Sequence, residues 1–244
     1  MKLKGKSAFV TGGTRGIGLA ITQRFCQEGA SVIIAGTENG EGADVAKRLR
    51  FEGYDVGFEP VDLTQAVSIE QAVGNAATRL SGLDILVNNA GVTTKGTIAK
   101  LTIEDWDRVQ AVNLRAPVFA MRAAYPHLYG GSIINIASIA AIDTPFGKAA
   151  YAASKAGLIA ASQVAAKEFA SRRVRVNVIA PGLIETDMLS QLPTPYRNEF
   201  VADTPLRRVG RPEEIASAAA YFASDEAEFV TGQVLRIDGG LHFR

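Results

Sequence analysis

A tyrosine and a lysine four residues apart could carry out proton chemistry in this chain. Tyr151 and Lys155 belong to the segment YAASK, inside an alanine-rich run. Residues i and i+4 of a helix lie on one face, so both side chains could act on the same small volume. Most tyrosine and lysine pairs in helices are instead a half-buried ring beside a solvated charge. The spacing alone leaves both interpretations open, and the rest of the chain must decide between them.

A glycine-rich segment follows the first predicted strand. It reads TGGTRGIG over residues 11–18, with Gly12, Gly16 and Gly18, and a helix is predicted to open at Ile17. Glycines permit a tight turn and bring backbone N–H groups close to a pyrophosphate, which then lies at the positive end of the helix. Three glycines could also serve only tight packing. Their place between a first strand and a first helix predicts a dinucleotide-binding turn.

The residues after the second predicted strand favour NADP(H) over NAD(H). In dinucleotide folds an acidic residue about 20 positions further on binds the adenosine ribose and repels a 2′-phosphate. Gly36 and Thr37 stand there in this chain. Arg15 and the Thr37 hydroxyl are suited to binding a 2′-phosphate. Glu38 argues the other way, so NAD(H) stays an alternative.

The composition predicts a protein that binds a small molecule. The 244 residues are 47% hydrophobic and 21% charged, with a net charge of +1. This balance supplies a large core but no basic field for nucleic acid or a membrane surface. No unbroken apolar run reaches 18 residues and no signal-type segment opens the chain, so we expect a cytoplasmic location. One cysteine, Cys26, and two histidines exclude an intrachain disulfide and argue against a metal site.

Short apolar runs alternate with segments of helical periodicity along the chain. Strands are expected at 7–10, 31–34, 56–61, 84–87, 132–137, 174–180 and 233–237, and helices at 17–28, 42–52, 67–80, 103–124, 151–171 and 212–222. This alternation predicts one Rossmann-type α/β domain over residues 1–244, with a doubly wound parallel sheet of about seven strands and helices on both faces. The stretch from about 183 to 206 is expected to be an irregular loop that acts as a substrate lid.

Six motifs resemble, in order, those of the classical short-chain dehydrogenase/reductases. TGGTRGIG matches the T-G-x-x-x-G-x-G turn, NNAG at 88–91 the fourth-strand motif, and YAASK the Y-x-x-x-K signature. Asn113, Ser138 and the PG pair at 181–182 fall in the expected places. The resemblance covers essentially the whole chain, and six motifs in sequence are very improbable by chance.

Within that family the chain is most similar to the 3-oxoacyl-[acyl-carrier-protein] reductases. The similarity is carried by GLIETDM at 182–188, ASDEAEFVTGQ at 223–233 and the closing IDGG. It implies NADP(H)-dependent hydride transfer to a carbonyl, with a 3-oxoacyl thioester or a related small β-keto compound as substrate. The alternatives are an NAD(P)-dependent dehydrogenase of a sugar, polyol or other secondary alcohol, and a dinucleotide-sensing regulator without turnover.

The resemblance implies a catalytic set of Asn113, Ser138, Tyr151 and Lys155. Tyr151 would be the general acid in reduction and the base in oxidation. Its ordinary pKa of about 10 is high for this task, but the Lys155 ammonium and a nicotinamide cation would both favour the phenolate. Ser138 would orient the substrate oxygen, and Lys155 would also bind the nicotinamide ribose. Ser138 lacks the G-x-S-x-G context of a hydrolase nucleophile.

A cofactor-binding set on the loops after the strands is also implied. Asp62 would bind the adenine, whereas Asn89 would either pack against the cofactor or tie adjacent strands together. The expected set is Gly12, Thr14, Arg15, Gly16, Ile17, Gly18, Thr37, Asp62, Leu63, Asn89, Ala90, Gly91, Tyr151, Lys155, Pro181, Gly182, Ile184 and Thr186.

Pro117 follows Asn113 by four residues and has no N–H to give to the Asn113 carbonyl. The resemblance implies that this carbonyl holds a water that links Lys155 to solvent. The alternative is that Pro117 only kinks the helix.

Two features bear on protein partners. The alanines at 150, 152, 153, 156, 160 and 161 predict close packing on more than one face of the helix, which fits the homotetramer of the family. Arg172 and Arg173 match half of the basic patch that the family uses for an acidic carrier protein, but HLYGGS, before the fifth strand, lacks the other half. We therefore expect the substrate to be reduced with little gain from an attached carrier.

Overall fold

The seven predicted strands form one parallel sheet in the computed structural model, which describes residues 1–37, 40–190 and 194–241. The strands are β1 (Ser7–Thr11), β2 (Ser31–Gly36), β3 (Val56–Pro60), β4 (Ile85–Asn88), β5 (Ser132–Ile136), β6 (Arg175–Pro181) and β7 (Val234–Ile237). Their order is β3-β2-β1-β4-β5-β6-β7. The order reverses between β1 and β4, which is where such sheets bind ligands.

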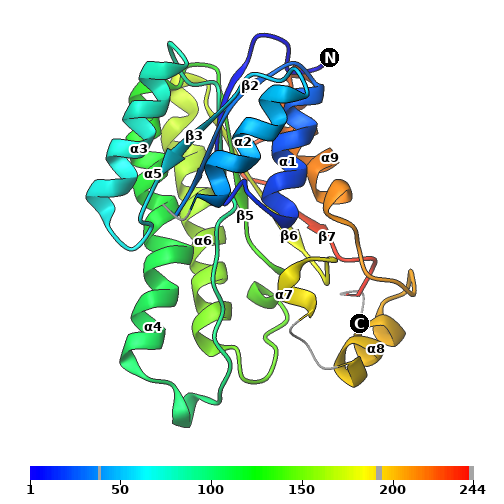
Figure 1. Cartoon of the computed structure of the whole chain (residues 1–244). Coiled ribbons are helices and arrows are strands. Elements are labelled where there is room, and N and C mark those ends of the chain that lie inside the picture. The colour runs from blue at the N-terminus through cyan, green and yellow to red at the C-terminus, as the bar shows by residue number, and fades with distance from the viewer. Residues whose placement is uncertain (38–39, 191–193, 242–244) are drawn as a thin grey trace.

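Helices cover both faces of this sheet. On one face lie α1 (Gly16–Gln27), α2 (Glu41–Phe51) and α9 (Pro212–Ala223), and on the other α3 (Ala66–Arg79), α5 (Ala116–Ala124) and α6 (Ala149–Glu168), as Figure 1 shows. The remaining α-helices are α4 (Ile103–Gln110), α7 (Asp187–Ser190) and α8 (Thr194–Asp203). The predicted fold class, a doubly wound parallel α/β sheet, is confirmed.

Successive strand residues supply two hydrophobic cores because they point to opposite faces of the sheet. Phe9, Ile33, Leu86 and Ile133 pack toward α3, α5 and α6, whereas Val10, Ile34, Val87 and Ile134 pack toward α1, α2 and α9. Both cores therefore hold the carboxyl ends of the central strands in fixed positions, and those ends lead into the loops of the site.

The helix expected over 103–124 is interrupted. Residues Ala111–Arg115 form a π-helical turn between α4 and α5. Pro117 explains the change, because it cannot donate a hydrogen bond to the residue four positions earlier, and the backbone must adjust its bonding there. The expected helical bounds of 103–124 are confirmed, and the π-helical turn within them falls on Asn113.

The stretch expected to be irregular contains two helices, α7 and α8. Pro195 lies in the first turn of α8, where a proline has no N–H to lose, and Pro205 follows the helix end. Pro193 lies outside the described residues. The prolines therefore bound a helix here rather than prevent one.

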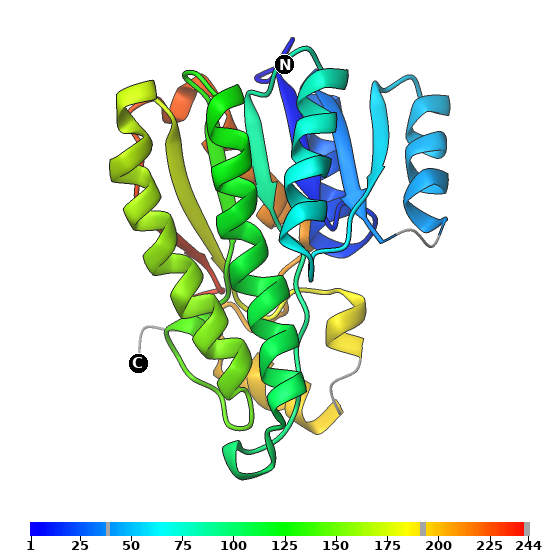
Figure 2. The ribbon, with the colours of Figure 1, turned by 90° about the vertical axis from the view of Figure 1, so that its left-hand side faces the viewer.

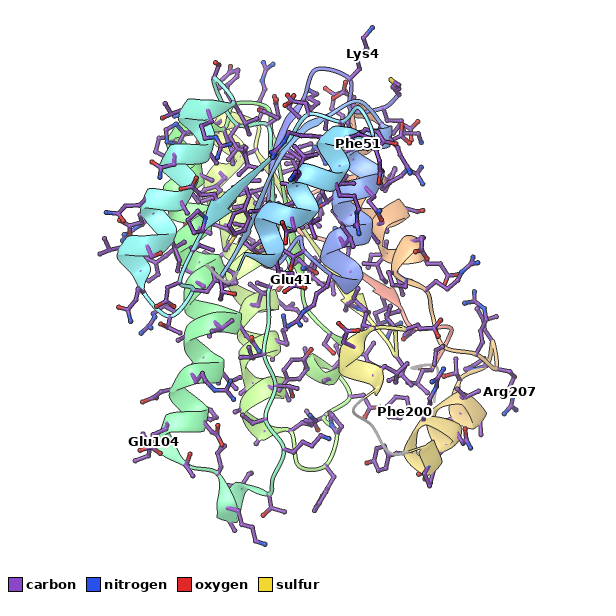
Figure 3. The ribbon with its side chains drawn as sticks, in the orientation of Figure 1. Lys4, Glu41, Phe51, Glu104, Phe200 and Arg207 are labelled. Atoms are coloured by element: carbon purple, nitrogen blue, oxygen red, sulfur yellow. The ribbon has the colours of Figure 1, made fainter. Side chains whose placement is uncertain are left out.

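Beyond the carboxyl ends of the strands, α4 and the first half of α6 stand on one side and α7 and α8 on the other (Figure 2). Figure 3 shows Glu104, at the start of α4, and Phe200, on α8, at opposite sides of this region. Among the described residues, no helix is long and apolar enough to cross a membrane.

Candidate active site

The glycine turn after β1 depends on the absence of side chains at three positions. Gly12 has φ +64° and Gly16 has φ +51°, in the left-handed region that favours glycine. A Cβ on Gly18 would lie 2.0 Å from the Gly12 carbonyl oxygen, so any larger residue would force helix α1 away from the turn. The predicted turn is therefore built so that its backbone can approach a ligand closely.

Helix α1 begins at this turn with an open N-terminus. No side chain caps it and its first turn contains no acidic residue, so the positive end of the helix stays available to an anion. Thr14, Arg15 and Ile17 belong to the turn and the start of the helix, and Arg15 is exposed. The backbone of the turn and the N-terminus of α1 can bind a pyrophosphate, and the exposed Arg15 can bind a further phosphate on the solvent side.

The end of β2 forms the next part of the site. A Cβ on Gly36 would contact the Thr14 methyl group at 3.6 Å and Phe58 at 3.8 Å, both ordinary distances. Thr37 is exposed beside it. The position thus has room for a carboxylate that this chain does not carry. Glu38, the residue that argued for NAD(H), lies outside the described residues.

The loop after β4 is tied to the glycine turn. The Asn89 side-chain amide donates to the carbonyls of Thr11 and Gly12, each at 3.1 Å, and the Thr11 hydroxyl accepts from the N–H groups of Asn89 and Ala90. These bonds favour the interpretation of Asn89 as a tie between strands. Thr11 was not predicted as a site residue, although it opens the TGGTRGIG motif at the end of a strand.

Gly91 brings the β4 loop against the catalytic side chains. A Cβ at this position would lie 3.4 Å from Asn113 Oδ1 and 3.5 Å from Lys155 Nζ. The buried Asn113 side chain accepts from the N–H of Val92 and donates to its carbonyl, both at 2.8 Å. It also donates to Ser154 Oγ at 3.1 Å. Asn113 therefore fixes the loop that passes directly over the lysine.

Ser138 and Tyr151 come together from β5 and α6. Their hydroxyl groups are hydrogen-bonded, and Ser138 Oγ also accepts from the N–H of Ala140. Burial raises the pKa of Tyr151, and the bond from Ser138 lowers it by less. The phenol is therefore protonated near neutral pH, which is the form that a general acid needs.

Lys155 is buried, with 3% of its surface exposed, and its ammonium donates to the Ile136 carbonyl at 2.7 Å. Burial lowers its pKa to about 8. The nitrogen lies 5.9 Å from the centre of the Tyr151 ring. The expectation that Lys155 lowers the pKa of Tyr151 is not met, because the ammonium is turned to a carbonyl and burial of the phenol dominates.

Asp62 and Leu63 follow the end of β3 at the same edge of the sheet. One carboxylate oxygen of Asp62 accepts from the hydroxyl of Thr64 at 2.7 Å and from its N–H at 2.9 Å. These two bonds lower the pKa of Asp62, which is exposed. An ionised, fixed carboxylate at this place is suited to accept a hydrogen bond from an adenine amino group.

The segment after β6 completes this edge. A Cβ on Gly182, which follows Pro181, would lie 2.8 Å from Asp238 Cα, so the chain passes close to the end of β7. Ile184 is buried. The Thr186 methyl group would lie 3.2 Å from a Cβ on Gly16, so Thr186 borders the glycine turn. The described residues predicted to bind the cofactor thus lie on the loops and helix starts that follow the strands, at the carboxyl end of the sheet.

Arg172 and Arg173 lie at the other end of the sheet. They precede β6, and Arg172 donates to the carbonyls of Leu128 and Pro126, both at 3.1 Å. Its guanidinium also lies 5.1 Å from the centre of the Tyr125 ring. The pair therefore lies away from the carboxyl end of the sheet in this chain, and Arg172 is engaged in holding loops together.

Known proteins share this fold and sequence over their full length. The family model described as Enoyl-(Acyl carrier protein) reductase matches residues 12–242. A 3-oxoacyl-[acyl-carrier-protein] reductase of Thermotoga maritima is 41% identical, covering 99% of both chains. A 2,5-dichloro-2,5-cyclohexadiene-1,4-diol dehydrogenase of Sphingobium indicum is 38% identical, covering 98% of this chain and 97% of the relative.

A solved structure agrees with this relationship. A short-chain dehydrogenase of Burkholderia cenocepacia in complex with NADP superposes with a TM-score of 0.94 at 34% identity, covering 99% of each chain. The expected fold and family are both confirmed. This chain belongs to the short-chain dehydrogenase/reductase family of oxidoreductases.

Proposed function

We propose that the protein is an NADP(H)-dependent reductase of a 3-oxoacyl thioester or a related small β-keto compound. The observation that carries the proposal is the hydrogen-bonded pair of Ser138 and a protonated Tyr151 beside the buried Lys155, at the same end of the sheet as the glycine turn. Cofactor binding alone would not require this arrangement of proton donors, which argues against a regulator without turnover.

The residues present fit a dinucleotide phosphate. The glycine turn and the open N-terminus of α1 would hold the pyrophosphate, Arg15 and Thr37 the 2′-phosphate, and Asp62 the adenine. Lys155 would bind the nicotinamide ribose. When bound, NADPH supplies the hydride that reduces the carbonyl carbon.

The proton half of the reaction falls to the chain itself. Tyr151 donates its phenolic proton to the substrate oxygen as negative charge develops there, while the Ser138 hydroxyl donates a hydrogen bond to the same oxygen. The π-helical turn at Asn113 supports replacement of that proton from solvent through a water that the Asn113 carbonyl would hold.

The helices α7 and α8 lie beyond the carboxyl ends of the strands, on the side opposite α4 (Figure 1). We assign to α7 and α8, within residues 183–206, the role of a lid over the site. The 3-oxoacyl class rests on the Thermotoga relative, whereas the dehydrogenase from Sphingobium supports secondary alcohols as the second candidate.

A homotetramer is also part of the proposal. Ala153, Ala156, Ala160 and Val164 form an exposed apolar stripe along α6, and Val164 is 54% exposed. A hollow of about 670 Å³ lies beside the stripe and is lined by residues of 96–99 and 144–149 with Ala152, Ala153 and Ala156. A second copy of the chain would cover the stripe. The cytoplasmic location stays a prediction.

The proposed function is tested by purified protein with NADPH or NADH against a panel of ketones, alcohols and thioesters. We expect NADPH-dependent reduction of short 3-oxoacyl thioesters, with lower kcat/KM for NADH. Turnover of sugars or polyols alone would favour the dehydrogenase, and tight NADPH binding with no turnover would favour the regulator.

A further inference from the structure

A lysine outside the catalytic set stands at the mouth of the active site. Lys148 directly precedes α6, three residues before Tyr151, and its ammonium donates to the Thr93 hydroxyl at 2.9 Å. The side chain is half-buried. Neither the proton transfer nor the cofactor groove uses it.

Backbone contacts fix the place of this ammonium relative to the catalytic residues. Thr93 follows Val92, whose N–H and carbonyl both bind the Asn113 side chain. The N–H of Gly96 donates to the Gly147 carbonyl at 3.2 Å, which joins the two loops. Lys148 therefore lies where the β4 loop leaves the catalytic centre and meets the start of α6.

The charge at this point is unbalanced within the protein. Lys148 forms no ion pair with any carboxylate in the described part of the chain. Burial lowers the pKa of its ammonium, and the like charge of Lys95 lowers it further. Partial desolvation next to a second cation costs free energy, and a bound anion would offset that cost.

We propose that Lys148 is a specificity-determining residue that binds an anionic group of the substrate, carried beyond the carbonyl that Tyr151 protonates. This inference rests on the proposed function and names its substrate class more closely: ketones with a negative charge. Lys95 adds to the field without needing to contact the ligand. The Thr93 hydroxyl holds the Lys148 ammonium in place when no anion is bound.

Two anions could meet Lys148, a carboxylate near the ketone or the phosphate of a pantetheine arm. Three probes separate them: 3-oxobutanoate, 3-oxobutanoyl-coenzyme A and the N-acetylcysteamine thioester of 3-oxobutanoate, which has no charge. Each is assayed with NADPH on the unmodified protein, Lys148→Met and Lys148→Arg. Lys47→Met, an exposed lysine on α2, is the matched control.

We expect Lys148→Met to lower kcat/KM for at least one charged probe by about 10-fold to 100-fold, the usual effect of losing a hydrogen bond to a charged group. The neutral thioester should change by less than about twofold, because it makes no charged contact. Lys148→Arg should retain most of the activity with the charged probe. Loss with 3-oxobutanoate identifies a carboxylate, and loss with the coenzyme A thioester alone identifies a phosphate.

Equal losses on all three probes, or no loss on any, would overturn the proposal, since Lys148 would then only shape the loop or do nothing. Absence of turnover in the unmodified protein would instead refute the proposed function. In that case calorimetric binding of 3-oxobutanoate and its methyl ester to the unmodified protein and Lys148→Met decides the question. A preference for the anion that disappears in Lys148→Met supports the inference, and equal binding overturns it.

Discussion

The two ends of the sheet use their polar side chains in opposite ways. At the amino end, Asp84 accepts from the N–H of Ser7 at 2.8 Å and from its hydroxyl at 3.0 Å, and Arg175 donates to the Phe222 and Ser224 carbonyls. At the carboxyl end, the N-terminus of α1 has no cap. Polar groups of one end satisfy each other, whereas those of the other end keep capacity for a ligand. The side chains that stabilise the fold and the groups that can bind a ligand are thus separated by one strand length, roughly 17 Å for five residues.

The largest expected effect is a loss of catalysis without a change in the fold. Tyr151→Phe removes the proton that reduction needs, so kcat should fall by at least about 100-fold. NADPH binding, measured by fluorescence titration, should change little, and Lys155→Ala should weaken it more. Near-normal turnover of every active substrate by Tyr151→Phe would show that the assigned chemistry is wrong.

A substitution at the amino end of the sheet should lower stability and leave catalysis unchanged. Asp84→Ala leaves the N–H of Ser7 without its acceptor, whereas the hydroxyl can still donate to the Gly82 carbonyl at 3.1 Å. We expect the free energy of unfolding to fall by about 2 kcal/mol. Urea unfolding and steady-state kinetics on the same preparation measure both properties. Asp84→Asn keeps an acceptor oxygen and should lose less stability. If kcat/KM fell along with stability, the two ends would not be independent.

Gly36→Asp tests how the carboxyl end selects its ligand. The added carboxylate has room beside Thr14 and would stand where the 2′-phosphate of NADP would lie. We expect the ratio of kcat/KM for NADPH to that for NADH to fall about tenfold or more, as charge repulsion replaces attraction. Gly36→Asn is the neutral control of equal size. A preference of the unmodified protein for NADH would contradict this interpretation and direct attention to Glu38.

A smaller effect is expected from pH. Because burial lowers the pKa of Lys155 to about 8, its charged form is lost at lower pH than for an exposed lysine. The value of kcat/KM for NADPH, which reports groups of the free enzyme, should therefore decline by a few fold from about pH 8 to 9. Lys155→Arg should move this decline beyond the measured range. The same decline in both proteins would assign it to another group.

The smallest effect concerns the carrier protein. Arg172 is engaged at the amino end, so Arg172→Ala should change kcat/KM for a carrier-linked thioester by less than about twofold. The ratio of carrier-linked to free thioester should also vary little with salt, since long-range attraction to an acidic partner is screened by salt. A strong carrier preference that collapses at high salt would show that these arginines suffice.

The features that could be predicted from the sequence are those that depend on local residue patterns. Strand positions followed from short apolar runs, whereas the choice of Tyr151 and Lys155 as a candidate pair needed the family resemblance in addition to helical spacing. Helix α8 escaped prediction because its apolar residues do not gather on one face. The direction of the Tyr151 pKa shift and the engagement of Arg172 also escaped, because both depend on burial and on partners distant in sequence.

The contact between Lys148 and Thr93 also could not be predicted from the local sequence. The two residues are 55 positions apart, and neither stands in a recognisable motif. Only the joining of the two loops by Gly96 and Gly147 brings them together. Residues that belong to sequence motifs can be identified from the sequence, whereas contacts between loops that are distant in the sequence can be identified only from the three-dimensional fold.

The geometry of the catalytic site depends on the number of residues in the π-helical turn. Each residue of an α-helix advances the rotation by about 100°, and a π-turn accommodates one extra residue without disturbing the helices on either side. Deletion of one residue within Ala111–Arg115 would leave α4 and α5 in their present phase but would shift the remaining side chains of the turn by one position, which is a rotation of about that angle. Asn113 would leave Val92, although every catalytic residue type was retained. The spacing through this turn is therefore as much a part of the active site as the side chains it presents.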